Sequence, residues 1–263
     1  MLKLFATDLD GTLLGHGNHI DEKDINAINS LVENKIEFTI ATGRMNRDIT
    51  EIVKLIKQKS HRVSQNGGFV HDKEGQLIYS QTFTGELSKR IHNAISNSIP
   101  LYCVSTADDI FVSEKTGIIQ QLEHLLYFPL KEGVNFSDQY GSSIHPAKFM
   151  ILGETDEISK QKDLLMKQFE SEVEAYLSDN HCVDIVPKGI SKALGLSHLI
   201  KILEINPVEI AVIGDSFNDI PMLEMTPLSY AMASAHPDVQ RKASKVVNHV
   251  HEAITDLKNQ GLY

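Results

Sequence analysis

The pattern that most restricts the fold of this 263-residue chain is an alternation of short apolar runs with amphipathic segments at both ends of the sequence. Short strands are expected to begin at Leu4, Ile36 and Glu209, and the last of these is a continuous apolar run, like strands buried on both faces of a parallel sheet. Helical periodicity over 21–32 and 191–203 separates such runs. We therefore expect an α/β fold with a Rossmann-like parallel sheet as its core.

The middle of the sequence follows a different pattern. From about Gly85, paired strands and flanking helices replace the alternation, which resumes past Pro187. Hairpins with helices beside them predict an α+β unit. The sequence thus predicts a core formed by residues 1–83 and 187–263, with an α+β domain, residues 84–186, inserted into it.

Composition argues against several classes of function. A formal net charge of -10 disfavours a nucleic-acid groove, which needs clustered Lys and Arg, so we expect no nucleic-acid partner. No apolar run approaches the roughly 20 residues that cross a bilayer. The first residues lead straight into a strand and do not resemble a signal peptide. A polar loop is expected at 15–19, after that strand. We expect a cytoplasmic protein without a membrane partner. Cys103 and Cys182 support neither a disulfide framework nor a thiolate zinc site.

Acidic, hydroxyl and glycine residues stand where three of the expected strands end. They are Asp8, Asp10, Thr42, Gly43, Asp215 and Asp219. Because the carboxyl ends of parallel strands lie at one edge of a sheet, these groups can meet in one pocket. Hard oxygen ligands of this kind suit Mg²⁺, which binds a few carboxylates and keeps positions for water and phosphate oxygens.

Four segments, in this order, resemble the motifs of the haloacid dehalogenase-like phosphohydrolases, specifically the Cof-type subfamily. They are Asp8-Leu9-Asp10-Gly11-Thr12, Thr42-Gly43-Arg44, the segment Pro187–Lys192, and Gly214–Asp219. The resemblance covers both ends of the chain. Cof-type relatives carry a large α/β cap of type IIB between the second and third motifs, where this chain has its expected insertion. The gap between the first two motifs is too short for the helical cap of phosphomutases of the β-phosphoglucomutase kind.

The resemblance implies a phosphatase that forms a covalent intermediate. Asp8 would be the nucleophile that attacks phosphorus and forms an aspartyl-phosphate, and Asp10 would be the general acid and base. Mg²⁺ would be held by the Asp8 carboxylate, the backbone carbonyl of Asp10 and Asp215. Asp219 would be a supporting or additional ligand of the metal.

The same resemblance implies a set of groups that bind the phosphoryl oxygens. These are the Thr42 hydroxyl, the Gly43 amide, Lys192 and Asn218. Lys188 competes with Lys192 for the role of the positive charge, but Lys192 fits the spacing of the motif better.

The expected substrate is a small phosphorylated metabolite, such as a sugar phosphate. The alternatives are a phosphotransferase or mutase with the same nucleophile, a phospho-aspartate regulatory switch, and a binding protein with an inactive fold. Loss of Asp8 or Asp10 would be the sign of the last of these. The sequence leaves open the physiological substrate, the oligomeric state, and whether Asn66 or Arg44 joins the site.

Overall fold

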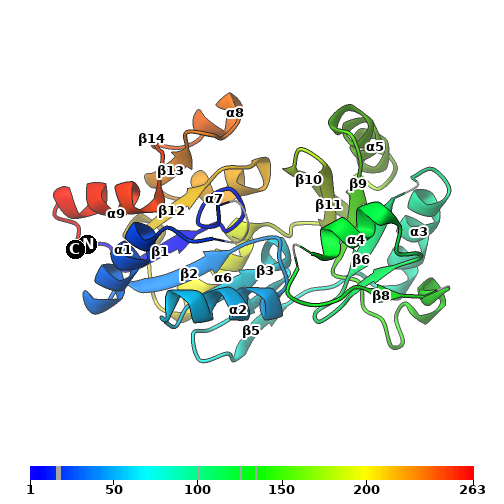
Figure 1. Cartoon of the computed structure of the whole chain (residues 1–263), viewed down its shortest axis with the longest axis horizontal. Helices are drawn as coiled ribbons and strands as arrows, with labels where there is room; N and C mark the ends of the chain where they lie inside the picture. Colours follow the sequence, from blue (N-terminus) through cyan, green and yellow to red (C-terminus); the bar gives the residue numbers. More distant parts are fainter. Residues whose placement is uncertain (16–18, 100, 125, 134) are drawn as a thin grey trace. The chain divides into compact units, whose positions relative to one another are not determined.

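A computed structural model describes residues 1–15, 19–99, 101–124, 126–133 and 135–263. These residues form two compact units, a core unit of residues 1–79 and 191–263 and an inserted unit of residues 80–190 (Figure 1). The polar loop expected at 15–19 falls mostly outside the described residues.

In the part of the chain that the structure describes, the core unit holds an eight-stranded sheet in the order β14-β13-β12-β1-β2-β3-β4-β5. Every pairing from β14 to β3 is parallel, and β4 is antiparallel to β3. The strands are β1 (Leu4–Thr7), β2 (Glu37–Ala41), β3 (His61–Ser64), β4 (Phe69–His71), β5 (Leu77–Ser80), β12 (Ile210–Gly214), β13 (Leu228–Met232) and β14 (Lys245–Val247). Strands from the two ends of the sequence meet in the middle of the sheet, where β1 pairs with β12.

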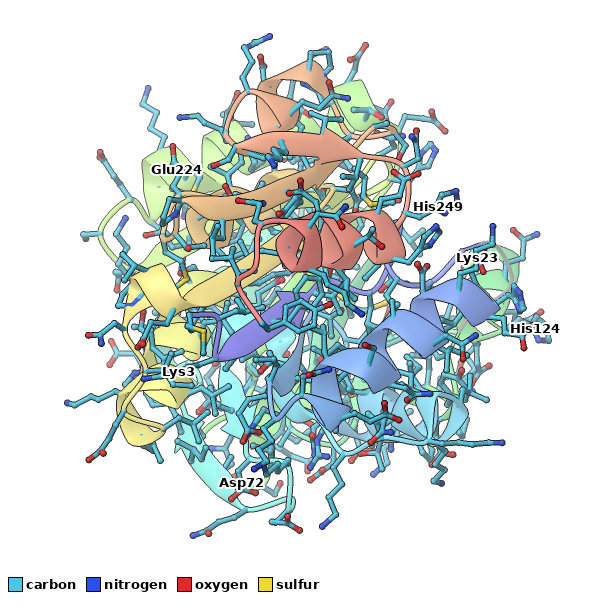
Figure 2. All side chains as sticks on the ribbon, turned by 90° about the vertical axis from the view of Figure 1, so that its left-hand side faces the viewer. Lys3, Lys23, Asp72, His124, Glu224 and His249 are labelled. Atoms are coloured by element: carbon cyan, nitrogen blue, oxygen red, sulfur yellow. The ribbon has the colours of Figure 1, made fainter. Side chains whose placement is uncertain are left out.

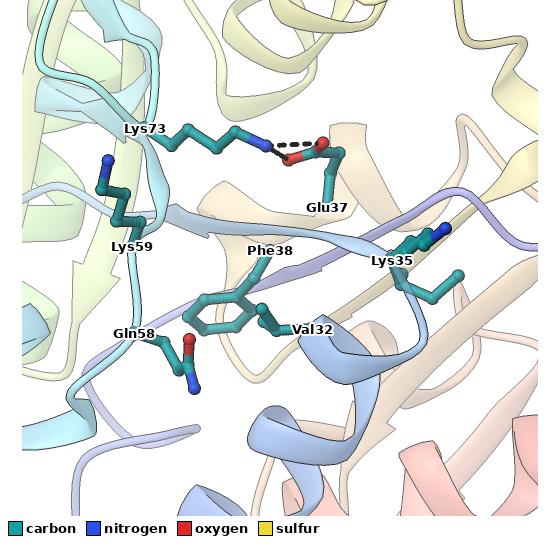
Figure 3. Close-up of a pocket in the computed structure, with 8 residues that line it drawn as sticks. Val32, Lys35, Glu37, Phe38, Gln58, Lys59 and Lys73 are labelled. Carbon is teal, nitrogen blue, oxygen red and sulfur yellow. Dashed lines mark hydrogen bonds and ion pairs between the residues drawn. The ribbon is translucent and has the colours of Figure 1, made fainter.

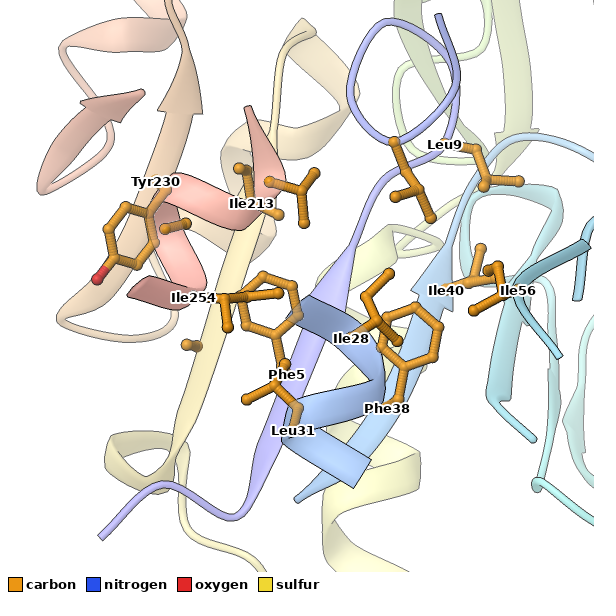
Figure 4. Packing of buried hydrophobic residues seen from close by; sticks show 14 of the residues in the cluster. Phe5, Leu9, Ile28, Leu31, Phe38, Ile40, Ile56, Ile213, Tyr230 and Ile254 are labelled. Atoms are coloured by element: carbon orange, nitrogen blue, oxygen red, sulfur yellow. The ribbon is translucent and has the colours of Figure 1, made fainter. Parts of the chain in front are cut away.

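Helices cover both faces of this sheet. They are α1 (Glu22–Glu33), α2 (Asn46–Ile56), α6 (Lys192–Ile202), α7 (Ile220–Leu223), α8 (Pro237–Gln240) and α9 (Val250–Asn259). Because side chains alternate along a strand, Phe5 belongs to the hydrophobic cluster of α1, α2 and α9 (Figure 4), whereas Leu4 and Ala6 belong to the cluster of α6, α7 and α8. Burial on both faces explains the continuous apolar runs in the sequence.

The inserted unit has a separate sheet and a separate hydrophobic cluster. Its strands, in the order β10-β11-β9-β6-β7-β8, are β6 (Tyr102–Ser105), β7 (Ile110–Val112), β8 (Lys131–Glu132), β9 (Lys148–Leu152), β10 (Val173–Asp179) and β11 (Cys182–Pro187). Its helices are α3 (Gly85–Ser96), α4 (Gly117–Glu123) and α5 (Thr155–Gln168). Phe149 and Val183 of this sheet pack with Ile91 of α3 and Leu165 of α5. The expected α/β fold, with a parallel core sheet and an inserted α+β domain, is confirmed.

Short 3₁₀ turns connect several of these elements. They occupy Gln65–Gly67, Phe136–Gln139, Pro207–Glu209 and Phe217–Asp219. The turn at Gln65–Gly67 has an unusual backbone, because φ is positive at three successive residues: 52° at Gln65, 56° at Asn66 and 100° at Gly67. It packs against the start of α6, where a Cβ atom on Gly67 would lie 2.1 Å from the carbonyl oxygen of Ser191. The absence of a side chain at Gly67 therefore fixes how closely the turn approaches the residue next to Lys192.

Replacing Gly67 with Ala is expected to lower the free energy of unfolding by about 2–4 kcal/mol, because the new methyl group cannot coexist with the Ser191 carbonyl and α6 must shift. Gly75→Ala is the matched control, since Gly75 also has a positive φ of 91° but its nearest neighbour would lie 3.5 Å from the Cβ. We expect that control to lose only about 1 kcal/mol. Urea denaturation measures both values, and equal losses would contradict the packing argument.

Candidate active site

The predicted site residues lie at the carboxyl ends of three adjacent parallel strands. Asp8 follows β1, Thr42 follows β2 and Asp215 follows β12, and both β2 and β12 pair with β1. Asp8, Asp215 and Asp219 form an acidic cluster, in which one carboxylate oxygen of each lies within 4.8 Å of the others. The topology of the sheet thus brings together acids from the two ends of the chain.

Lys192 lies inside this cluster at the first position of α6. Its Nζ donates hydrogen bonds of 2.6 Å to Oδ1 of Asp8 and 2.6 Å to Oδ1 of Asp219. The Lys192 side chain is only 1% exposed. Burial alone would lower the pKa of Lys192, but Asp219 and Asp8 raise it well above the ordinary value of a lysine. The ammonium group is therefore held in its charged form between two carboxylates.

Asp219 and Thr12 organise the loop that carries Asp215. Oδ2 of Asp219 accepts the backbone N–H groups of Asp215 (3.0 Å) and Ser216 (2.9 Å). The Thr12 hydroxyl donates a hydrogen bond of 2.6 Å to Oδ1 of Asp215. Gly11, with φ of 80°, leaves room for that carboxylate, since a Cβ at Gly11 would lie 2.5 Å from Oδ2 of Asp215. Both oxygens of Asp219 are thus engaged within the protein.

The acidic cluster carries more negative charge than Lys192 offsets. Burial raises the pKa of Asp8 by more than Lys192 lowers it, and Asp219 and Asp215 raise it further. Burial, followed by the charge of Asp219, raises the pKa of Asp215 to about 6. The buried carboxylates of Asp8 and Asp219 and the partly buried one of Asp215 are costly beside one ammonium group without a further cation. The all-oxygen donor set and the excess of negative charge fit a hard divalent metal ion.

The repulsion among these carboxylates predicts that Asp215→Asn stabilises the metal-free protein at neutral pH. The pKa of Asp215 rises from about 3.9 in the unfolded chain to about 6 in the fold, so the folded state binds the proton more tightly. Stability is therefore lost as the pH rises from about 4 to 6, and the isosteric amide avoids that loss. We expect a gain of about 1–3 kcal/mol at pH 8 that disappears below about pH 4.

Thermal or urea unfolding in chelator, measured between pH 4 and pH 8, checks this prediction. Asp163→Asn is the control, because the Asp163 side chain is 80% exposed, and we expect no pH-dependent gain from it. A loss of stability in Asp215→Asn at pH 8 would contradict the proposed repulsion.

Asp10 is placed differently from the other acids. Its side chain is 54% exposed and lies outside the acidic cluster. The guanidinium group of Arg44 holds its carboxylate in a two-pronged ion pair, with Nη2 at 2.6 Å from Oδ1 and Nε at 2.9 Å from Oδ2. Arg44 thus does form an ion pair, and its partner is the predicted general acid and base.

The predicted phosphate-binding groups surround the ends of β2 and β12. Oγ1 of Thr42 accepts the N–H of Arg44 at 3.2 Å, which leaves the hydroxyl proton as a donor. Gly43 lies between these two residues. Nδ2 of Asn218 donates to Oδ1 of Asn66 at 3.1 Å, and both side chains are buried. Asn66 therefore holds the side chain of Asn218 by a hydrogen bond. The sequence had left open whether Asn66 joins the site.

The core unit also has a pocket that includes the start of β2, at the other end of this strand from Thr42 (Figure 3). Its lining residues are Val32, Lys35, Ile36, Glu37, Phe38, Gln58, Lys59 and Lys73. Glu37 begins β2, whereas Thr42 follows the end of the same strand. Lys73 Nζ lies 2.8 Å from Oε1 of Glu37, so this charge is already paired within the pocket. The pocket is separate from the acidic cluster.

Within the described ranges, every helix is too short or too polar to cross a bilayer.

Comparisons with known proteins agree on one family. The family model described as haloacid dehalogenase-like hydrolase matches residues 5–255. The chain is 26% identical to Phosphatase YwpJ of Bacillus subtilis, over 93% of this chain and 94% of that protein. It is 25% identical to the HMP-PP phosphatase of Yersinia pseudotuberculosis, over 92% and 88% of the two chains. A haloacid dehalogenase-like hydrolase from Bacteroides thetaiotaomicron has the same fold, with a TM-score of 0.85, 22% identity and coverage of 98% and 100%.

Proposed function

Because this chain belongs to the haloacid dehalogenase-like hydrolases, we propose that it is a Mg²⁺-dependent phosphatase that hydrolyses small phosphomonoesters, such as sugar phosphates, through an aspartyl-phosphate. The observation that carries this proposal is the buried contact of Asp8 with Lys192 inside a cluster of three acids. The two relatives named as phosphatases support the reaction class.

Asp8 is the proposed nucleophile. Its carboxylate attacks phosphorus and forms a P–O bond, while the bond to the substrate alcohol breaks and Asp10 gives a proton to the departing oxygen. Asp10 then takes a proton from water, which attacks the phosphoryl group and releases inorganic phosphate and free Asp8. The 54% exposure of the Asp10 side chain supports this role, because its carboxylate is open to solvent although it is paired with Arg44. Lys192 orients Asp8 by holding Oδ1.

The proposed metal site uses Asp8, Asp215 and the backbone carbonyl of Asp10. A bound Mg²⁺ supplies positive charge that offsets the repulsion between the acids and a dianionic phosphate. Asp219 is proposed to support this site and not to bind the metal, because its two oxygens already accept hydrogen bonds from Lys192 and from two backbone N–H groups. Thr12 fixes the orientation of Asp215.

The phosphoryl oxygens are bound, in this proposal, by four groups from different parts of the sequence. They are the Thr42 hydroxyl, the Gly43 N–H, the Lys192 ammonium group and the Asn218 amide. Preorganised donors of this kind stabilise charge that develops on the phosphoryl oxygens and typically contribute about 10²–10³-fold each to turnover. Asn66 positions Asn218 through its hydrogen bond.

The inserted unit is proposed to choose the substrate. We assign residues 1–83 and 187–263 to the catalytic core and residues 84–186 to a cap domain. The support is that the chain separates into two compact units with separate hydrophobic clusters, and that the acids and Lys192 all come from the core unit. Chemistry and selectivity would then depend on different parts of the protein.

A panel of metabolite phosphomonoesters tests the proposal, with phosphate release measured in Mg²⁺ and in chelator. We expect release from at least one sugar phosphate or similar compound in Mg²⁺, and a loss of at least about 100-fold in chelator. If folded, Mg²⁺-loaded protein released no phosphate from any compound of the panel, the proposed phosphatase activity would be contradicted. Addition of alcohol acceptors separates hydrolysis from transfer, because a phosphotransferase would yield a new phosphoester. A stable phospho-aspartate without turnover would indicate a regulatory switch.

A further inference from the structure

A second group of metal-ligating side chains lies in the core unit, where α1 meets α9. Asp24 comes from the first turn of α1, whereas His249 is the N-cap residue of α9 and His251 lies in its first turn. One ligand atom of each residue lies within 4.8 Å of the others. These three residues form a histidine cluster, which shares no residue with the acidic cluster. Figure 2 shows His249 at the molecular surface beside the end of α1 that carries Lys23.

The contacts of His251 prepare one of its ring nitrogens for a metal. Oδ1 of Asp24 accepts both the backbone N–H of His251 and its ring Nδ1, each at 2.7 Å. An ionised carboxylate only accepts hydrogen bonds, so this contact assigns the proton to Nδ1 and makes Nε2 the nitrogen that is suited to bind a metal. A carboxylate behind an imidazole is the arrangement that orients ligating histidines and makes them more basic.

His249 completes the cluster from the exposed side. Its ring stacks on that of His251, with centroids 5.0 Å apart and 19° between the planes. Asp24 is only 3% exposed, so the buried carboxylate forms a fixed floor and the two imidazoles form the accessible side. Two ligands on a tetrahedral zinc ion lie about 3.3 Å apart, and the ligand atoms of the cluster lie within 4.8 Å of one another, so the exposed imidazole of His249 has to turn towards the ion.

We propose that His249 and His251, with Asp24 hydrogen-bonded behind His251, form a surface site for a divalent transition metal of the Zn²⁺ type where α9 packs on α1. Imidazole nitrogens select Zn²⁺, Ni²⁺ or Cu²⁺, whereas Mg²⁺ prefers oxygen ligands, so the two metal sites of the core unit differ in chemistry. The acids Asp21 and Glu252 flank the histidines and add negative charge around the site. This inference does not depend on the proposed phosphatase activity.

Zn²⁺ titration of the full chain tests the site. The protein is first stripped with chelator and then kept in excess Mg²⁺, which occupies the oxygen-ligand site without competing for imidazole. Calorimetry is expected to detect Zn²⁺ binding to the wild type that is at least about 10-fold weaker in His249→Gln and about 10–100-fold weaker in Asp24→Asn. Zn²⁺ is also expected to raise the thermal midpoint of the wild type more than that of His249→Gln.

Two variants serve as controls. His236→Gln removes another exposed N-cap histidine, at the start of α8, and should bind Zn²⁺ as the wild type does. Asp8→Asn should also retain the binding, which distinguishes this site from the acidic cluster. Cu²⁺ as a second probe should show two coordinating nitrogens by electron paramagnetic resonance and one in His249→Gln. Absence of Zn²⁺ binding to the wild type, or equal affinity in His249→Gln, would overturn the proposal.

Discussion

Asp8→Asn is expected to lower the rate of phosphate release by at least about 10⁴-fold while the protein stays folded. An amide is not a nucleophile towards phosphorus, so the covalent step is lost. The fold should tolerate the change, because burial raises the pKa of Asp8 and a neutral isostere removes one of three repelling charges. Lys192 keeps its second partner, Oδ1 of Asp219.

Steady-state phosphate release and acid-quenched trapping of labelled protein check this prediction together. The wild type should acquire an acid-stable phosphoryl label during turnover, and Asp8→Asn should acquire none. Asp163→Asn changes the same side chain at an exposed position of the inserted unit and should retain activity. Activity within tenfold of the wild type in Asp8→Asn would reject the covalent mechanism.

Lys192→Met should reduce both stability and turnover. The methionine side chain retains most of the packing volume but leaves the buried carboxylates of Asp8 and Asp219 without their ammonium partner, a change that typically costs about 3–5 kcal/mol. Turnover should also fall by about 10²–10³-fold, because the charge that orients Asp8 and faces the phosphoryl group is lost. The stability loss should be largest at pH 8 and should shrink as the pH falls towards 5, because protonation of Asp8 and Asp215 relieves their repulsion.

Urea unfolding in chelator at pH 8 and pH 5, with kinetics in Mg²⁺, measures these effects. Lys188→Met is the matched control, because Lys188 lies nearby in the sequence but forms only a partly exposed ion pair with Glu174. Its loss should stay below about 1 kcal/mol. If Lys188→Met abolished activity and Lys192→Met did not, the lysine of the site would have to be reassigned.

The sequence predicted the features that follow from sheet topology. Continuous apolar runs identify buried parallel strands, and parallel strands necessarily place Asp8, Thr42 and Asp215 at one edge. Particular hydrogen-bond partners were not predictable in the same way. The ion pair between Arg44 and Asp10 depends on the path of the chain after β2. The hydroxyl of Thr12 was visible within the first motif, two residues after Asp10, and could have been predicted as a donor to an acid.

Other contacts depend on packing between distant segments. Asn66 supports Asn218 because a turn of unusual backbone geometry brings it to the end of β12, and no local pattern encodes that distance. The histidine cluster joins Asp24 to residues near the other end of the chain, and twelve histidines offer many pairings. Only the packing of α1 on α9 selects His249 and His251 from among them.

The pairing of β1 with β12 also sets the order in which the newly made chain can reach its native state. Leu4 is among the first residues synthesised, but its neighbour across the ladder is Ile210. At about 5–20 residues per second, β1 waits on the order of 10–40 seconds on the ribosome before that partner emerges. The inserted unit, by contrast, is one uninterrupted stretch, residues 80–190, and is complete earlier. The chain thus finishes the segment proposed to choose the substrate before it can assemble the acids and the lysine of the candidate active site.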